Sequence, residues 1–340
     1  MLATDEGMTA KDLIASNLVW DNHGCMPLRP FDEAFLPKLE LYRASGVDVA
    51  MLNIGFGEQG IEEHVRMLAH FRRWIRAHND RYLLIETIDD LSLARATNRL
   101  AIGFDMEGAN GIADQPGLIS LYYDLGVRWM LMAYNGSNRI GGGCQDDEDL
   151  GLTAYGREVL DEMARVGMVA CCSHTGYRTA RDVLEYSRKP VIFSHSNPRA
   201  LFDHPRNIPD ELILGCARTS GVVCLNGIGN FLGNNDTSTE NYFRHVDHVV
   251  QQAGAEHVGI GLDYVFDTAE LDDYLVKMKD MFPPELGYDL DGGFKCVSPA
   301  QIESLVELQI KAGYSQEDIR NILGGNLLRV AQAIWNPGLS

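Results

Sequence analysis

The chain has 340 residues with a formal net charge of -19 at pH 7, and 45% of its residues are hydrophobic and 23% charged. This composition is that of an ordinary soluble protein, and the negative charge disfavours nucleic acid and anionic membrane surfaces as partners, because both would repel it. The seven cysteines are an odd number without the spacing of a disulfide framework, which indicates a reducing compartment.

The start of the chain, MLATDEGMTAKDLIASNLVW, contains acidic residues early and no long apolar stretch behind basic residues. As written, it is not typical of a signal or transit peptide. No apolar run approaches the roughly 20 residues that a membrane-spanning helix needs. We therefore expect a cytoplasmic protein. The sequence does not set the oligomeric state, and a homodimer is compatible with it.

Short apolar runs rich in β-branched residues alternate with longer helical patterns along the whole chain, which is typical of repeated βα units. Eight of these runs are mostly apolar throughout, as parallel strands buried on both faces are. Eight parallel strands joined by eight crossover connections predict an α/β fold, a (β/α)8 or TIM barrel. We expect residues 1–340 to form this barrel as one domain. The predicted strands are residues 18–25, 47–56, 100–108, 128–135, 168–174, 190–196, 222–228 and 257–264.

Two predicted connections are longer than ordinary βα loops: residues 135–151 after the fourth strand and residues 266–298 after the eighth. Long connections in compact domains are usually functional lids or disordered segments. The glycine triplet at residues 141–143 is compatible with a mobile lid or with a solvated surface loop. The tail, residues 315–335, predicts a helical extension of two helices broken at residues 324–325 that packs across the outside of the barrel. Other helical patterns lie at residues 60–79, 153–166, 179–187, 209–219 and 241–253.

Polar residues are concentrated at the carboxyl ends of the predicted strands, which in such a barrel face the active-site mouth. Each has a simple explanation on its own, since a glutamate can cap a helix, an aspartate can end a strand and a histidine or cysteine can fill a core. Together they are harder to explain by packing, because a buried acid or imidazole costs free energy unless it is paired or metal-bound. They are His23 and Cys25 in the first strand, Glu107 in the third, Tyr134 in the fourth, His174 in the fifth, His195 in the sixth and Asp263 in the eighth.

A metal site explains these residues jointly. Three imidazoles and a carboxylate are suitable zinc ligands, and a glutamate can use its two oxygens to bridge two ions about 3.5 to 4 Å apart. His23 and Cys25 are two residues apart, so a strand would place both side chains on one face. The sequence therefore predicts a zinc centre, with two ions expected, at the mouth of the barrel.

Several segments, in this order and spacing, resemble the membrane (renal) dipeptidase family, peptidase family M19 of the amidohydrolase superfamily. The resemblance covers most of the chain and includes the polar strand ends. The matching segments are DNHGCMPL, DMEG, LGVRWMLMAYN, GLTAYGREVLDEMARVGMV, CCSHTG, PVIFSHSNPRAL, RNIPDE, GIGLDY and ILGGNLLRV.

The resemblance implies a zinc-dependent dipeptidase with a binuclear centre in which Glu107 bridges the two ions. His23 then belongs to one ion, whereas His174 and His195 hold the other. In such enzymes a metal-bridged hydroxide attacks the carbonyl of a small dipeptide, and Asp263 passes its proton to the departing amine. The resemblance also implies that a D-residue is tolerated on the C-terminal side of the bond.

The resemblance further implies that Arg206, in RNIPDE, binds the terminal carboxylate of the substrate. Arg206 could instead pair with Asp210 one helical turn later.

Two positions depart from the family pattern. Cys25 stands where the family has an aspartate ligand; it is either a substituted ligand, because thiolate binds zinc, or a lost one. Tyr134 stands where the family has a histidine that contacts the substrate carbonyl or the oxyanion; its phenol can donate a hydrogen bond but carries no positive charge at neutral pH.

These departures leave two alternatives to dipeptide hydrolysis. One is an amidohydrolase acting on another small amide, such as an N-acyl amino acid or a lactam, because Tyr134 and the long connections would reshape the pocket. The other is a degenerate, non-catalytic member that binds a metal or a peptide. Cys25 favours that second alternative, and the intact site residues oppose it. These are Glu107, His174, His195, Arg206 and Asp263.

Overall fold

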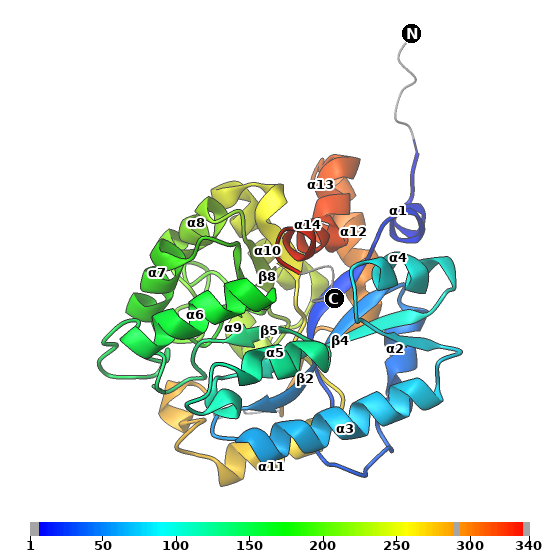
Figure 1. Cartoon of the computed structure of the whole chain (residues 1–340). Helices are drawn as coiled ribbons and strands as arrows, with labels where there is room; N and C mark the ends of the chain where they lie inside the picture. The colour runs from blue at the N-terminus through cyan, green and yellow to red at the C-terminus, as the bar shows by residue number, and fades with distance from the viewer. Residues whose placement is uncertain (1–6, 289–292, 336–340) are drawn as a thin grey trace.

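A computed structural model describes residues 7–288 and 293–335; residues 1–6, 289–292 and 336–340 lie outside the described part. The predicted domain, residues 1–340, includes all three of these segments, and the predicted long connection 266–298 includes one of them. Within the described part, parallel strands form a barrel that is surrounded by helices (Figure 1). The predicted (β/α)8 barrel is confirmed.

The barrel closes because its first strand pairs in parallel with its last principal strand, with Asp21 opposite Ile260. The remaining neighbours also pair in parallel and in chain order around the ring. Each predicted strand overlaps one strand of the barrel. These strands are β1 (Trp20–Cys25), β2 (Val49–Phe56), β4 (Leu100–Glu107), β5 (Val127–Leu131), β6 (Val169–Cys171), β7 (Val191–Phe193), β8 (Val222–Leu225) and β9 (Val258–Ile260).

The structure contains two short strands besides these eight; β3 was not predicted, and β10 begins at the last residue of the predicted strand 257–264. Strand β3 (Tyr82–Leu84) pairs with the first residues of β4 and adds to the sheet beside the ring. Strand β10 (Tyr264–Val265) pairs with β1 at Gly24 and Cys25, beyond the point where β9 pairs with β1. The eighth strand is therefore in two pieces, β9 and β10, which are separated around Asp263.

The predicted helical patterns form helices with identifiable ends. Helix α6 begins after Thr153, whose side chain accepts a hydrogen bond from the Gly156 amide, and it ends at Gly167, which has a left-handed φ of 98°. The helices that confirm the patterns are α3 (Ile61–Ala77), α6 (Ala154–Val166), α7 (Tyr177–Tyr186), α8 (Asp210–Arg218) and α10 (Thr239–Ala253). Within residues 7–288 and 293–335, no helix combines the length and the apolar character that crossing a bilayer requires.

Further helices complete the ring and its two ends. The α-helices are α1 (Ala10–Ser16), α2 (Glu40–Ala44), α4 (Asp89–Ala96), α5 (Leu118–Asp124), α9 (Gly229–Leu232), α11 (Thr268–Lys277), α12 (Ile302–Lys311), α13 (Gln316–Arg320) and α14 (Asn326–Ile334). Short 3-10 helices are Leu36–Leu39, Asn110–Ile112, Ala255–His257, Pro284–Leu286 and Pro299–Gln301, and Asn321–Gly325 forms a π-helical turn.

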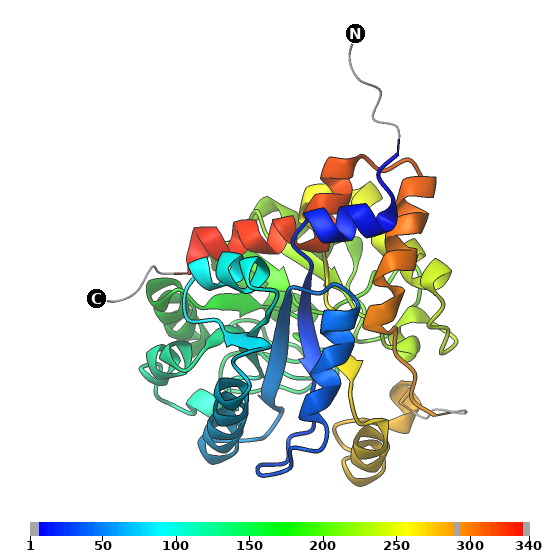
Figure 2. The ribbon, with the colours of Figure 1, turned by 90° about the vertical axis from the view of Figure 1, so that its right-hand side faces the viewer.

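The tail closes the end of the barrel opposite the site. It forms α13 and α14 with the π-helical turn between them, which confirms the predicted break at residues 324–325. Leu327 and Val330 of α14 pack with Trp20 and Trp129 in the apolar cluster that fills the barrel interior. Figure 2 shows α14 and α11 at opposite ends of the barrel. The tail thus covers one end of the barrel and does not lie along its outer wall. The reason is that the apolar side chains of α14 pack against the apolar side chains of the barrel interior.

The first long connection, residues 135–151, is a packed segment. The Gly142 amide donates a hydrogen bond of 2.9 Å to Thr179 Oγ1. A Cβ atom at Gly143 would lie 2.0 Å from the carbonyl oxygen of Asn135, so no larger residue fits there. Close packing, against side chains at Gly141 and Gly142 and against backbone at Gly143, therefore accounts for the glycine triplet, rather than a mobile lid or a solvated loop.

Candidate metal centre

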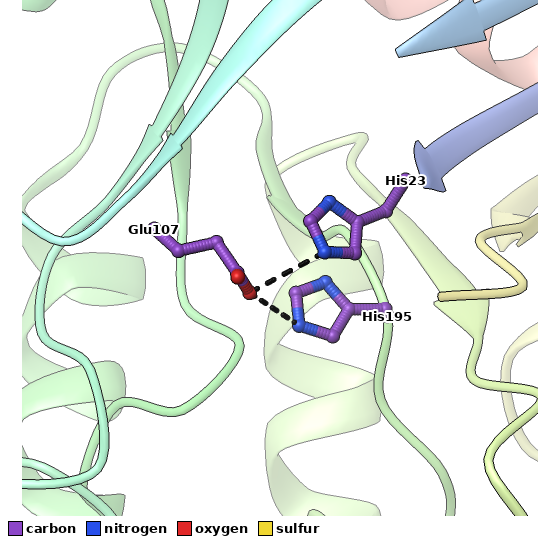
Figure 3. Close-up of side chains that lie close together, drawn as sticks. All are labelled: His23, Glu107 and His195. Atoms are coloured by element: carbon purple, nitrogen blue, oxygen red, sulfur yellow. Dashed lines mark ion pairs between the residues drawn. The ribbon is translucent and has the colours of Figure 1, made fainter. Parts of the chain in front are cut away.

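Four of the predicted donors lie together at the carboxyl ends of the strands. Glu107 ends β4, His23 lies in β1, and His174 and His195 follow β6 and β7. The Nε2 atoms of His23, His174 and His195 lie 3.5, 3.3 and 3.0 Å from Glu107 Oε1. Figure 3 shows the rings of His23 and His195 side by side, both pointing at the Glu107 carboxylate. The fold therefore brings these four side chains to one point, as the sequence predicted.

Hydrogen bonds in the surrounding shell orient two of these imidazoles. His23 Nδ1 lies 3.2 Å from Asp105 Oδ2, and His174 Nδ1 lies 2.7 Å from Asn135 Oδ1. An ionised Asp105 carboxylate and the Asn135 amide oxygen only accept hydrogen bonds, so Nδ1 of each imidazole donates. In the neutral form of each ring, Nε2 then keeps its lone pair. These lone pairs face Glu107, which is the orientation of metal-ligating histidines.

The electrostatics of the cluster favour a cation. Burial raises the pKa of Glu107, although the charge of His23 opposes that rise. Burial also lowers the pKa of His174 and that of His195, so both imidazoles are neutral near pH 7. His174 Nε2 and His195 Nε2 lie only 3.0 Å apart. A divalent metal ion would stabilise the ionised carboxylate and use the neutral imidazoles as ligands, so the donor set fits a metal.

Cys25 and Asp263 form a second group of donors beside His23. Cys25 Sγ lies 3.1 Å from Asp263 Oδ1 and 3.5 Å from His23 Nε2. Asp263 Oδ1 lies 3.4 Å from the same His23 nitrogen. The ligand atoms of these three side chains lie close enough to one another to bind one metal ion. Cys25 is thus placed where it could ligate, and its role as a ligand stays a prediction.

A labelling experiment tests the role of Cys25. We expect its thiol to resist alkylation in the zinc-loaded protein and to react after chelation, because a metal-bound thiolate is protected. Mass spectrometry of the labelled peptides measures the change. Cys296, a half-buried thiol outside the donor groups, serves as the internal control. Equal labelling of Cys25 with and without chelator would show that it merely lines the pocket.

The Asp263 carboxylate is ionised and held by hydrogen bonds. Burial would raise its pKa, but hydrogen bonds from His23 and Cys25 and the positive charge of His23 outweigh burial and lower the pKa. Asn226 Nδ2 donates a hydrogen bond of 2.9 Å to Asp263 Oδ2. The other oxygen, Oδ1, faces Cys25 and His23, so Asp263 presents one carboxylate oxygen to the centre.

Two site residues have left-handed backbone conformations. His174 has a φ of 61° and Asp263 a φ of 55°, values that cost non-glycine residues on the order of 1 kcal/mol or more. Backbone hydrogen bonds hold both residues, from the Cys144 amide to the His174 carbonyl at 2.8 Å and from the Asp263 amide to the His23 carbonyl at 3.0 Å. Strain maintained in this way at two donors favours a functional role over simple packing.

Arg206 is buried with part of its guanidinium unused. Its Nη2 atom donates to the His195 carbonyl at 3.2 Å, while Nε and Nη1 have no hydrogen-bond partner among the described residues. Asp210 instead accepts a hydrogen bond of 2.9 Å from His248. The alternative that Arg206 pairs with Asp210 is therefore wrong for the described structure. Its free N–H groups suit a carboxylate brought by a ligand.

Tyr134 lies beside the metal donors. Its ring stacks on His174 with the ring centroids 4.1 Å apart. The tyrosine also lines the same cavity as Glu107 and Asp263. Burial raises the pKa of Tyr134 well above its ordinary value, so the phenol stays protonated and keeps its hydrogen-bond donor.

Sequence reasoning missed the polar residues that orient the predicted donors. Asp105 was recoverable, because it lies two residues before Glu107 and so shares its strand face. Asn53 Nδ2 lies 3.2 Å from both Asp105 Oδ1 and Glu107 Oε2. Asn53 lies inside the second predicted strand, and a single buried asparagine in a strand is equally explained by ordinary hydrogen bonding, so its role in the site was not predictable. The other missed residues are Asn135, Ser194 and Asn226.

The fold and the site together define a parallel (β/α)8 barrel with a candidate metal centre at the carboxyl ends of its strands. The sequence profile of the membrane dipeptidase family (peptidase family M19) matches residues 40–281. The chain belongs to this family.

Curated relatives and solved structures agree with this assignment. Dipeptidase verJ of Clonostachys rogersoniana is 30% identical over 265 residues, which cover 76% of this chain and 62% of that protein. An uncharacterized dipeptidase of Schizosaccharomyces pombe is 33% identical over 204 residues, which cover 57% of this chain and 48% of that protein. The chain thus spans about half to three fifths of the length of these relatives.

Among solved structures, an amidohydrolase from Pseudomonas aeruginosa is 26% identical with a TM-score of 0.87, and the match covers 96% of this chain and 99% of that one. A metallo peptidase from Rhodobacter sphaeroides, liganded with a phosphinate mimic of the dipeptide L-Ala-D-Ala, is 19% identical with a TM-score of 0.76, and the match covers 94% and 99%. At that identity the second likeness shows the fold alone.

Proposed function

We propose that this protein is a zinc-dependent dipeptidase that hydrolyses the amide bond of small dipeptides. The observation that carries the proposal is the convergence of three imidazole Nε2 atoms on one oxygen of Glu107, in a chain of the membrane dipeptidase family. Glu107 would be shared by two zinc ions, with His174 and His195 on one side and His23 and Cys25 on the other. Zinc bound there would supply the Lewis acidity that polarises a scissile carbonyl and activates water near neutral pH.

The residues around the centre supply the other parts of the reaction. Asp263 has an ionised carboxylate with one oxygen facing the centre, so it can take a proton and transfer it to the departing amine. Tyr134 lies over His174, where its phenol can donate a hydrogen bond to the carbonyl oxygen of the substrate. Arg206 binds the terminal carboxylate through the N–H groups that lack a partner within the described chain.

The assignment of Arg206 predicts a change in substrate preference. We expect Arg206→Ala to lower kcat/KM for free-acid dipeptides by about 10- to 100-fold, because charge-assisted hydrogen bonds to the carboxylate are lost. Hydrolysis of the corresponding dipeptide amides, which lack that charge, should change much less. Arg206→Lys should recover part of the preference. If Arg206→Ala keeps the full preference for free-acid dipeptides over their amides, another residue binds the carboxylate.

A substrate panel tests the proposed function. The zinc-loaded protein is assayed with matched L,L and L,D dipeptides, N-acyl amino acids and small lactams, before and after chelation. We expect chelator-sensitive hydrolysis of dipeptides, with a D-residue accepted on the C-terminal side. Hydrolysis confined to N-acyl amino acids or lactams would favour the alternative amidohydrolase activity. A metal-loaded protein that hydrolyses none of these compounds would be a non-catalytic member.

A further inference from the structure

The cavity above the candidate metal centre is enclosed mainly by apolar side chains. Its floor includes Glu107, His174 and Asp263. Large apolar and aromatic residues from strand β2, helix α9 and several loops form much of the wall. They are Phe56, Ile228, Phe231, Phe282, Tyr288 and Phe294. This chamber is the space that a side chain of a bound dipeptide would enter.

Helix α11 supplies one wall of the chamber. Leu271, Tyr274 and Leu275 line the cavity, whereas Val276 is 68% exposed on the outer face of the same helix. The spacing of the lining residues is that of one face of an amphipathic helix. Tyr274 also meets Phe56 edge to face, with ring centroids 5.6 Å apart, so α11 packs against the opposite rim. The helix therefore covers the chamber with an apolar face.

Two carboxylates reach the rim of the chamber, but each is already paired. Arg29 Nη2 lies 3.1 Å from Asp267 Oδ2, and Arg29 Nη1 lies 2.8 Å from Glu270 Oε1. Arg29 follows β1, so these ion pairs also tie the start of α11 to the edge of the barrel. Arg29 Nε also lies 2.9 Å from Asp32 Oδ2, so one positive charge is shared among three carboxylates and the rim keeps a net negative charge. This rim repels an anionic substrate side chain, whereas the lining above the polar floor of the chamber is suited to apolar groups.

We infer that the protein selects dipeptides that carry a bulky apolar side chain, and that Leu271 and Leu275 are specificity-determining residues. This inference rests on the proposed dipeptidase function and deepens it. Apolar surface that enters the chamber leaves water, which favours binding. An anionic side chain would lose hydration there and would meet the carboxylates of Asp267 and Glu270 at the rim. Selectivity therefore arises because apolar side chains bind favourably in the chamber and anionic side chains are excluded from it.

The preference is measured with dipeptides that share a backbone and differ in one side chain. We expect kcat/KM for leucine- or phenylalanine-containing dipeptides to exceed that for the alanine and aspartate analogues by at least about 10-fold, within the range that apolar pockets achieve. Equal values for phenylalanine and alanine substrates would overturn the inference while leaving the dipeptidase function intact.

A binding measurement separates the inference from the proposed function. Calorimetry on the zinc-loaded protein compares uncleavable phosphinate dipeptide analogues that bear phenylalanine or alanine side chains. We expect the phenylalanine analogue to bind at least about 10-fold more tightly, whether or not dipeptides are hydrolysed. Equal affinity would overturn the inference. Tighter binding without hydrolysis of any dipeptide would refute the proposed function and retain the selectivity.

A matched pair of variants on α11 locates the selectivity. Leu271→Asp places a charge in the chamber, and we expect it to remove the preference for phenylalanine over alanine while the zinc content stays unchanged. Leu271→Ala should reduce the preference by a smaller factor. Val276→Asp introduces the same charge on the exposed face of the helix and should leave the preference unchanged. A full preference in Leu271→Asp, or equal losses in Leu271→Asp and Val276→Asp, would contradict the assignment.

Discussion

Replacing His174 or His195 with alanine is expected to remove at least one equivalent of zinc per chain and to lower dipeptide turnover by more than about 100-fold. Replacement of residues that merely support a metal ligand typically costs 10- to 100-fold, so the loss of a ligand should exceed that range. The reason is geometric, since both Nε2 atoms lie within 3.3 Å of Glu107 Oε1 and within 3.0 Å of each other.

Metal analysis after dialysis measures this loss directly. His248→Ala is the matched control, because His248 pairs with Asp210 away from the donor group. It should retain the full zinc content and activity. Unchanged zinc in both His174→Ala and His195→Ala would refute their assignment as ligands.

Asp263→Asn is expected to retain the fold and the metal content while kcat falls by about 10²- to 10⁴-fold, the range for loss of general acid–base help. Asparagine has nearly the same shape as aspartate and can still accept the hydrogen bond from Asn226. It cannot, however, take up and return a proton as a carboxylate does. The expected loss therefore lies in the chemical step.

Turnover and zinc content are measured together for Asp263→Asn. Near-normal turnover would remove Asp263 from proton transfer. Loss of zinc along with turnover would instead make Asp263 a ligand, for which it is also placed, because its Oδ1 atom groups with His23 and Cys25. Asn226→Ala should give a smaller loss of turnover than Asp263→Asn, because it frees the carboxylate without removing it.

The barrel could be predicted because its strands are apolar on both faces and regularly spaced by helices. The short strand β3 was missed, since three residues with a few pairing partners leave little pattern in a sequence. The break between β9 and β10 was missed for a different reason. It depends on the left-handed backbone of Asp263, which the residue type alone does not reveal.

The candidate donors could be predicted because parallel strands end at one edge, which brings distant residues to one point. The hydrogen bonds that orient these donors could not be predicted. Asn135 reaches His174, and Asn226 reaches Asp263, through loop geometry that no periodicity encodes. Helix α11 lies in the second long connection, for which the sequence predicted only an unusual length. The role of its apolar face follows from the position of the helix over the candidate metal centre, which the sequence does not reveal.

The proposed function requires that this group of imidazoles and carboxylates binds zinc and that the bound zinc enables dipeptide hydrolysis. Both requirements are tested by titrating the chelated protein with zinc during continuous measurement of dipeptide hydrolysis. We expect no hydrolysis without metal and a rise that saturates at two zinc ions per chain. Hydrolysis that persists after complete chelation, or no hydrolysis at saturating zinc, would contradict the proposed function.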